Sequence, residues 1–174
     1  MTRVHFRDAG PADAAALSEL GRRTFTETFG HLYAPENLAA FLETHNEADW
    51  AAQLADPAFA VRVAEVGTAL AAYAKLGPPS LPFEPRGASI ELRQFYVLKP
   101  WHGGGVAAQL MDWALSEARR RGAEDLYLSV FVDNHRARRF YARYGFEFVG
   151  LYAFMVGDHA DEDHVMRLSL RNAG

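Results

Sequence analysis

The sequence contains no cysteine. This absence excludes disulfide bonds, zinc sites built from thiolates and a cysteine nucleophile. Long apolar runs are also missing, because no stretch approaches the roughly eighteen residues of a membrane-spanning helix. The first ten residues, MTRVHFRDAG, lack the apolar core of a signal peptide. We therefore expect a cytoplasmic protein that has no membrane partner.

A net positive charge is missing as well. The formal net charge is −4, which argues against nucleic acid as the main partner. The acidic residues are unevenly spread, since residues 11–60 contain eight of them against two arginines. Two interpretations stay open: these side chains form solvated helix faces, or they form an electrostatic funnel for a cationic substrate.

The length of the chain limits its organisation. With 174 residues, 49% of them hydrophobic, the chain is long enough for one substantial core and short for two ordinary domains. We expect one domain over residues 1–174. The seven histidines show no spacing of the H-E-x-x-H type, so no metal site is predicted.

Apolar periodicity and turn residues predict mixed helices and strands. In the first half we expect strands over 2–7, 58–66 and 69–76, helices over 11–23, 34–45 and 47–54, and a proline-rich loop over 77–88. In the second half we expect strands over 89–98 and 126–132, helices over 106–121 and 134–144, and a final antiparallel pair, 146–156 and 163–170, around an acidic turn, GDHADED. The strand, helix and strand between 89 and 132 should place two strands in parallel.

The turn before the helix at Val106 contains three consecutive glycines, Gly103, Gly104 and Gly105. Amides at a helix start lack an intrahelical partner and carry the positive end of the helix dipole, so this site suits a phosphate. A nucleotide P-loop is excluded because no lysine and hydroxyl residue follow the glycines. A dinucleotide fingerprint and a purely structural turn remain as alternatives on this stretch alone.

A second stretch decides between these alternatives. NHRARRFYARYGF, from Asn134 to Phe146, together with HGGGVA, resembles the GCN5-related N-acetyltransferase (GNAT) family. The resemblance extends from about Val4 to Leu170. It implies an α/β GNAT fold, with a mixed, mostly antiparallel sheet of about seven strands, a splay between the two central parallel strands, and helices on both faces. It also implies acetyl-coenzyme A (acetyl-CoA) as co-substrate.

The resemblance implies a set of cofactor-binding residues. The glycine turn and helix start would bind the pyrophosphate, a strand segment would pair with the pantetheine arm, and the later helix would line that arm. These residues are His102, Gly103, Gly104, Gly105, Val106, Ala107 and Ala108 for the turn, Phe95, Tyr96 and Val97 for the strand, and Asn134, Ala137 and Tyr141 for the later helix. His102 departs from the family pattern, in which glutamine or arginine is usual.

Acetyl transfer to an amine makes two demands on proton transfer. An alkylamine with a pKa of about 10.4 must lose a proton, which costs about 4.6 kcal/mol at pH 7, and the departing thiolate must gain one. Glu91 is the candidate base, although a structural pairing with Arg93 is an equal alternative. Tyr141 is the candidate acid, because a phenol stays protonated at pH 7 and can donate to a thiolate.

The acceptor is the least determined part of the prediction. Phe25, Glu27, Phe29 and Tyr33 could form the acceptor site or, for the aromatic rings, pack in the core. TFTETFGHLYAPENLAAFLE and FMVGDHADEDHVMRLSL resemble PaiA-type polyamine acetyltransferases, which implies a polyamine as a small-molecule amine acceptor. A peptide, a protein amine or a small amino metabolite is the alternative acceptor, and a non-catalytic acetyl-CoA sensor is the alternative of another class. The resemblance is also compatible with a homodimer.

Overall fold

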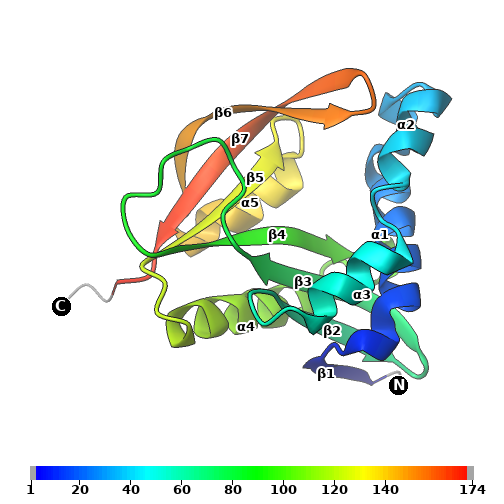
Figure 1. The fold of residues 1–174 in the computed structure, drawn as a ribbon, viewed down its shortest axis with the longest axis horizontal. Coiled ribbons are helices and arrows are strands. Elements are labelled where there is room, and N and C mark those ends of the chain that lie inside the picture. Colours follow the sequence, from blue (N-terminus) through cyan, green and yellow to red (C-terminus); the bar gives the residue numbers. More distant parts are fainter. Residues whose placement is uncertain (1–2, 172–174) are drawn as a thin grey trace.

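The computed structural model describes residues 3–171, in which seven strands form one sheet with helices on both of its faces (Figure 1). The strands are β1 (Val4–Asp8), β2 (Ala60–Val66), β3 (Ala69–Gly77), β4 (Ser89–Val97), β5 (Asp125–Phe131), β6 (Glu147–Val156) and β7 (His159–Ser169). The helices are α1 (Ala14–Phe29), α2 (Pro35–Leu42), α3 (Glu47–Ala55), α4 (Val106–Arg120) and α5 (His135–Tyr144).

The order of the strands in the sheet is β1-β2-β3-β4-β5-β7-β6. Every neighbouring pair is antiparallel except β4 and β5, which run parallel and are joined through α4. The predicted mixed, mostly antiparallel α/β sheet is therefore confirmed. Within residues 3–171, no helix combines the length and the apolar character needed to cross a membrane.

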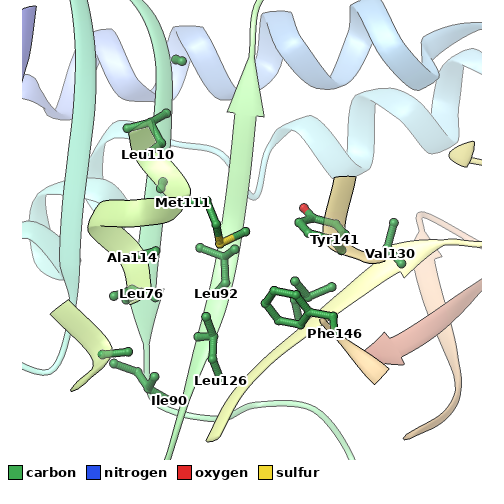
Figure 2. Close-up of a cluster of buried hydrophobic side chains, with 14 of the residues drawn as sticks. Leu76, Ile90, Leu92, Leu110, Met111, Ala114, Leu126, Val130, Tyr141 and Phe146 are labelled. Atoms are coloured by element: carbon green, nitrogen blue, oxygen red, sulfur yellow. The ribbon is translucent and has the colours of Figure 1, made fainter. Parts of the chain in front are cut away.

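One face of the sheet is covered by α4 and α5. Leu110, Met111 and Ala114 on α4 are fully buried and pack over apolar side chains of the central strands (Figure 2). Each such leucine or methionine stabilises the fold by about 1.5–3 kcal/mol relative to an exposed side chain. This packing fixes the start of α4, and with it the glycine turn, beside the C-terminal end of β4.

The other face is covered by α1 and α3. Leu17 on α1 and Trp50 on α3 are buried against Tyr73 on β3. Helix α1 approaches closely at Gly21, where an added Cβ atom would lie 2.8 Å from Cδ2 of His45 and 3.0 Å from the Tyr73 hydroxyl. The close approach holds the C-terminal half of α1 over the middle of the sheet.

Two predicted boundaries are wrong. Helix α1 does not end at Arg23 but continues to Phe29, so the aromatic residues that repeat every fourth position lie on one helix and its extension. The acidic segment predicted as a turn is mostly strand, because β7 begins at His159. The first strand starts at Val4, and Thr2 lies outside the described residues.

The turn between β6 and β7 is docked on α2. The backbone N–H of Asp158 donates to the side-chain oxygen of Asn37, at 3.0 Å. At Gly157, which has a φ of 59°, an added Cβ atom would lie only 2.5 Å from the same oxygen. Figure 1 shows the tip of this hairpin beside α2. The first helices and the last hairpin therefore meet at one end of the molecule.

Candidate active site

The parallel strands β4 and β5 pair only at their start. The pairing runs from Ser89 opposite Asp125 to Glu91 opposite Tyr127, although β4 continues to Val97. Figure 1 shows the two strands diverging beyond this point. Their adjoining edges therefore leave peptide groups for which the sheet supplies no partner, and these groups are available to a ligand.

The register of β4 on β3 decides which peptide groups face the opening. The N–H of Leu98 donates to the carbonyl of Ala71, at 3.0 Å, so the peptide groups of Leu98 face β3. Peptide groups alternate in direction along an antiparallel pair. Those of Phe95 and Val97 consequently face the opening, whereas the peptide groups of Tyr96 face β3 and only its side chain lines the site.

The glycine turn leaves the start of α4 open. Gly103 and Gly105 have φ angles of 80° and 84°, and an added Cβ atom would meet nothing within 4 Å at either position. The first intrahelical bond of α4 runs from the N–H of Gln109 to the carbonyl of Gly105. The amides of the preceding residues therefore have no helical acceptor, while the buried Val106 side chain anchors the turn to the core.

His102 occupies the position where the family pattern has glutamine or arginine. Its Nε2 atom lies 2.7 Å from the carbonyl oxygen of Val97. The imidazole thus joins the glycine turn to the open edge of β4. Its ring also lines the cavity between β4, the glycine turn and α5.

Helix α5 places Asn134 and Tyr141 on the other side of the opening. The Asn134 side chain caps the helix by accepting a hydrogen bond from the N–H of Ala137, at 3.3 Å. The Tyr141 ring is buried, with centroids 6.4 Å from Phe95 and 5.6 Å from Phe146 (Figure 2). Burial, and next the neighbouring Tyr96, raise the pKa of the Tyr141 hydroxyl above its usual value, so this phenol stays protonated at neutral pH.

A cavity of about 530 Å³ brings most of the predicted site residues together. Those that line it are Phe25, Phe29, Tyr33, Phe95, Tyr96, Val97, His102, Gly103, Gly105, Ala107, Ala108, Asn134, Ala137 and Tyr141. Gly104 and Val106 lie in the turn but not in the lining. Glu27 is also outside it, since its carboxylate accepts a hydrogen bond from the N–H of Lys99 and lies 3.6 Å from Arg23.

The charges in this cavity are separated. Arg136 and Arg143 line the end formed by α5 and the glycine turn, whereas Asp161 and Asp163 on β7 line the end beside α1. Arg93 on β4 also lines the cavity, and its Nε donates to the carbonyl oxygen of Pro78, at 2.9 Å. None of the eight acidic residues between positions 11 and 60 lines the cavity. Six of the eight are exposed, as expected of solvated helix faces, and the electrostatic funnel predicted as their alternative is not formed by them.

The acidic end was missed by the sequence reasoning. Asp161 and Asp163 are 7% and 5% exposed and lie two residues apart on β7, so both point to the same face of the strand. The hydroxyl of Tyr33 donates to one oxygen of Asp161, and His159 lies 3.0 Å from the other. Burial, followed by the nearby Asp161 carboxylate, raises the pKa of Asp163 to about 7.

Glu91 lines a second cavity, of about 240 Å³, and not the first. Its carboxylate accepts hydrogen bonds from the backbone N–H and the hydroxyl of Ser80, at 2.7 and 3.0 Å, and lies 4.0 Å from Nε of Arg93. The two cavities share part of their lining, including Gln94 and Ser129. Glu91 therefore lies near the larger cavity without lining it.

Comparison with protein families decides the identity of this site. The model of the acetyltransferase (GNAT) family matches residues 16–146, which is most of the chain. The chain belongs to this family. An uncharacterized N-acetyltransferase of Mycobacterium tuberculosis is 35% identical over 155 residues, covering 88% of this chain and 96% of the relative. Another, from Lactobacillus delbrueckii, is 29% identical over 174 residues, covering 98% and 99%.

Solved structures of GNAT proteins share the fold. The PaiA N-acetyltransferase of Thermoplasma acidophilum, in complex with coenzyme A, has a TM-score of 0.76 at 16% identity, covering 96% of this chain and 99% of its own. The yncA protein of Salmonella typhimurium, solved with acetyl-CoA, has a TM-score of 0.69 at 21% identity, covering 99% and 96%. The predicted GNAT fold is confirmed, and the chain is an acetyl-CoA-dependent N-acetyltransferase.

The described residues fit the co-substrate of a GNAT enzyme. The space over Gly103 and Gly105 would be narrowed by any side chain, and the free amides at the start of α4 are donors suited to phosphate oxygens. The open edge of β4 offers the peptide groups of Phe95 and the N–H of Val97 to an extended chain, while His102 engages the Val97 carbonyl. Two donor sets are therefore arranged in the order in which a pyrophosphate and a pantetheine arm require them.

Proposed function

We propose that this enzyme transfers the acetyl group of acetyl-CoA directly to a primary amine, without a covalent enzyme intermediate. The observation that carries the proposal is that one cavity is lined by the glycine turn, by the protonated Tyr141 and by the acidic pair Asp161 and Asp163. We extend the proposal to residues 1–174 as one catalytic domain. A cytoplasmic location and a homodimer remain predictions from the sequence.

Acetyl-CoA would supply the activated thioester. The amides from Gly103 to Ala108 bind the pyrophosphate in this proposal, and the peptide groups of Phe95 together with the N–H of Val97 orient the pantetheine arm. Asn134 contributes its side-chain NH₂ group, because its oxygen is engaged at the helix start. Arg136 and Arg143 add positive charge at the same end of the cavity.

Tyr141 acts as the general acid in this proposal. Its hydroxyl keeps its proton at neutral pH, because burial raises its pKa above the usual value of 10. The departing sulfur develops its negative charge inside the same cavity, where the Tyr141 hydroxyl can donate a hydrogen bond to it and then its proton. The phenol is then restored by solvent.

A polyamine is the proposed acceptor. Two buried carboxyl groups at the end of the cavity opposite the arginines support a cationic amine over a neutral or anionic one. Phe25, Phe29 and Tyr33 surround this end with rings that suit an alkyl chain. The structural relative PaiA is only 16% identical, so its name gives no support for the choice of acceptor. The support for a polyamine is the charge of the cavity.

Release of the thiol from acetyl-CoA tests the proposal. Spermidine, spermine, putrescine, amino acids and short peptides should be compared at equal concentration, and the polyamines are expected to give the highest kcat/KM. Preference for an amino acid or a peptide would contradict the polyamine proposal while leaving acetyl transfer intact. Absence of thiol release with every amine would contradict the catalytic proposal.

Gly105→Glu tests the cofactor site. Its carboxylate would add bulk and negative charge at the position proposed for the pyrophosphate, so acetyl-CoA binding measured by calorimetry should fall at least 100-fold. Ser116→Glu adds the same side chain to an exposed position of α4, away from the turn, and should bind acetyl-CoA normally. Equal binding by the two variants would refute the assignment of the glycine turn.

A further inference from the structure

The acidic end of the cavity contains two carboxyl groups. Both oxygens of Asp161 have a hydrogen-bond partner, whereas one oxygen of Asp163 has none among the described residues. Asp161 is held by the Tyr33 hydroxyl on one oxygen and by His159 on the other. The Oδ1 atom of Asp163 is buried and has no hydrogen-bond partner among the described residues. A buried carboxylate oxygen without a partner is unfavourable unless a ligand supplies the donor.

The surroundings of Asp163 favour a positively charged donor. The groups that face it are Asp161 on β7, Ser129 on β5, Tyr96 on β4 and Tyr33 beyond α1, while Tyr152 lies opposite it on β6. Asp161 adds a negative charge beside Asp163. The Tyr96 phenol adds no charge, because burial raises its pKa and keeps it neutral. No arginine or lysine is among the groups that act on Asp163.

We propose that Asp163 binds the ammonium group of the acceptor and takes its proton, so that the amine becomes a nucleophile beside the thioester. The inference rests on the proposed acetyl transfer and names the recognised substrate class, a cationic primary amine. Asp161, fixed by Tyr33, holds the second negative charge in place and is the positioning residue. Ser129, whose hydroxyl acts to lower the pKa of Asp163 against the larger effects of burial and Asp161, lies on the cavity wall between Leu128 and Val130.

The protons balance along this route. The ammonium group gives one proton to Asp163, and the neutral amine attacks the thioester carbon. The carbon–nitrogen bond forms and the carbon–sulfur bond breaks. The second proton leaves the nitrogen as the amide forms and replaces, through solvent, the proton that Tyr141 gives to the thiolate. Asp163 finally releases its proton to solvent, so each turnover of an ammonium substrate yields one proton, one thiol and one amide.

The position of Asp163 favours it over Glu91 as the proton acceptor. Glu91 lines the second cavity, and Ser80 donates two hydrogen bonds to its carboxylate. Both bonds occupy the carboxylate with donors of the protein itself. Asp163 lines the same cavity as Tyr141, has an oxygen without a partner, and has a pKa raised to about 7 by burial and by Asp161. A pKa near the working pH is the one at which general base catalysis is most effective.

Asp163→Asn tests the proposal, with Glu162→Gln as the matched control. Glu162 is the neighbouring carboxylate on β7 and is exposed, so its loss changes the net charge equally without changing the cavity. With spermidine, kcat should fall at least about 100-fold in Asp163→Asn, with acetyl-CoA affinity within twofold of the wild type. The wild-type kcat should rise with pH through about 7, and this limb should be absent in the variant.

A change of acceptor separates a base from a structural residue. Trifluoroethylamine is already neutral at pH 8, so it needs no base for the first proton, and the deficit of Asp163→Asn should shrink at least tenfold with it. A deficit of the same size with both amines, or normal activity with spermidine, would overturn the proposal. A large loss in Glu91→Gln with none in Asp163→Asn would place the base at Glu91 instead.

A measurement on the wild-type protein keeps the test independent of turnover and of the folding of the variant. The carboxyl carbon of Asp163 should titrate near pH 7 in carbon NMR, and saturating spermidine should lower that pKa, because a nearby ammonium favours the carboxylate. An Asp163 resonance that spermidine leaves unchanged would overturn the proposal. If spermidine shifts the resonance but no thiol is released, the proposed transfer fails and cation recognition stands.

Discussion

Tyr141 is positioned by its neighbours more than by hydrogen bonds. The rings of Phe95 and Phe146 have centroids 6.4 and 5.6 Å from that of Tyr141. Figure 2 shows Phe146 and Val130 beside it. Rings packed in this way restrict the hydroxyl to a small region of the cavity wall. The same burial that fixes the ring raises the pKa of the hydroxyl and keeps it protonated at neutral pH, which the proposed role of general acid requires before the transfer.

Tyr141→Phe should therefore lower kcat about 100-fold with little change in acetyl-CoA affinity, because only the transferable proton is removed. Tyr144→Phe is the control one turn later on α5, where the hydroxyl makes only weak contacts of 3.4 Å with Ala108 and Asp112. Steady-state kinetics with both substrates provides the measurement. Equal turnover in the two variants would exclude Tyr141 as the acid.

The residues that could be predicted from the sequence are those whose role follows from local structure. Gly103 and Gly105 need positive φ angles at a helix start, and Asn134 caps its own helix, so each is recognisable within a few residues. Asp161 and Asp163 are different. Within GDHADED they resemble the solvated acids of a turn, and only the pairing of β7 with β5 and β6 makes them buried. The spacing of two residues between them is the one local signal that both side chains lie on the same face of a strand.

At the scale of elements, the acidic end of the cavity is assembled from segments near both ends of the chain. Tyr33 follows α1, whereas its partner Asp161 lies on β7. The β6–β7 turn is held against α2 through Asn37, which fixes the register between these parts. The predicted end of α1 at Arg23 would have separated Phe25 and Phe29 from the helix, yet their spacing of four residues was the pattern of a continuing helix.

Gly157→Ala should loosen this junction. Its Cβ atom would lie 2.7 Å from the Asn37 backbone, in addition to the strain of a positive φ, so the free energy of unfolding should fall by about 2–3 kcal/mol. Gly67→Ala is the matched control, since Gly67 has a φ of 62° in the β2–β3 hairpin with open space around it. That variant should lose only about 1 kcal/mol.

Urea unfolding measures both losses, and kinetics adds a functional measure. Because the β6–β7 hairpin carries Asp161, Gly157→Ala should also raise KM for the amine, which Gly67→Ala should not. Equal destabilisation of the two variants would mean that contact between the hairpin and α2 contributes nothing to stability.

At the scale of the whole molecule, the burial of two neighbouring carboxyl groups in one cavity lowers the free energy of unfolding at neutral pH. Folding buries Asp163 beside Asp161 and raises its pKa from an ordinary value of 3.8 to about 7. The folded state then binds a proton that the unfolded state releases between about pH 4 and pH 7. Stability is lost as the pH rises through this range, because the folded state binds more protons than the unfolded state. His45 acts in the opposite direction, since burial lowers its pKa to about 4.

Asp163→Asn should consequently be more stable than the wild type at pH 8 while being far less active. A shift of about three pKa units corresponds to about 4 kcal/mol, so the advantage of the variant should grow by up to that amount between pH 4 and pH 8. Urea unfolding of both proteins at the two pH values measures it, and their difference cancels the contribution of His45. Glu162→Gln, which removes an exposed charge, should show no such growth. A constant difference between the wild type and Asp163→Asn would mean that Asp163 titrates normally in the folded enzyme.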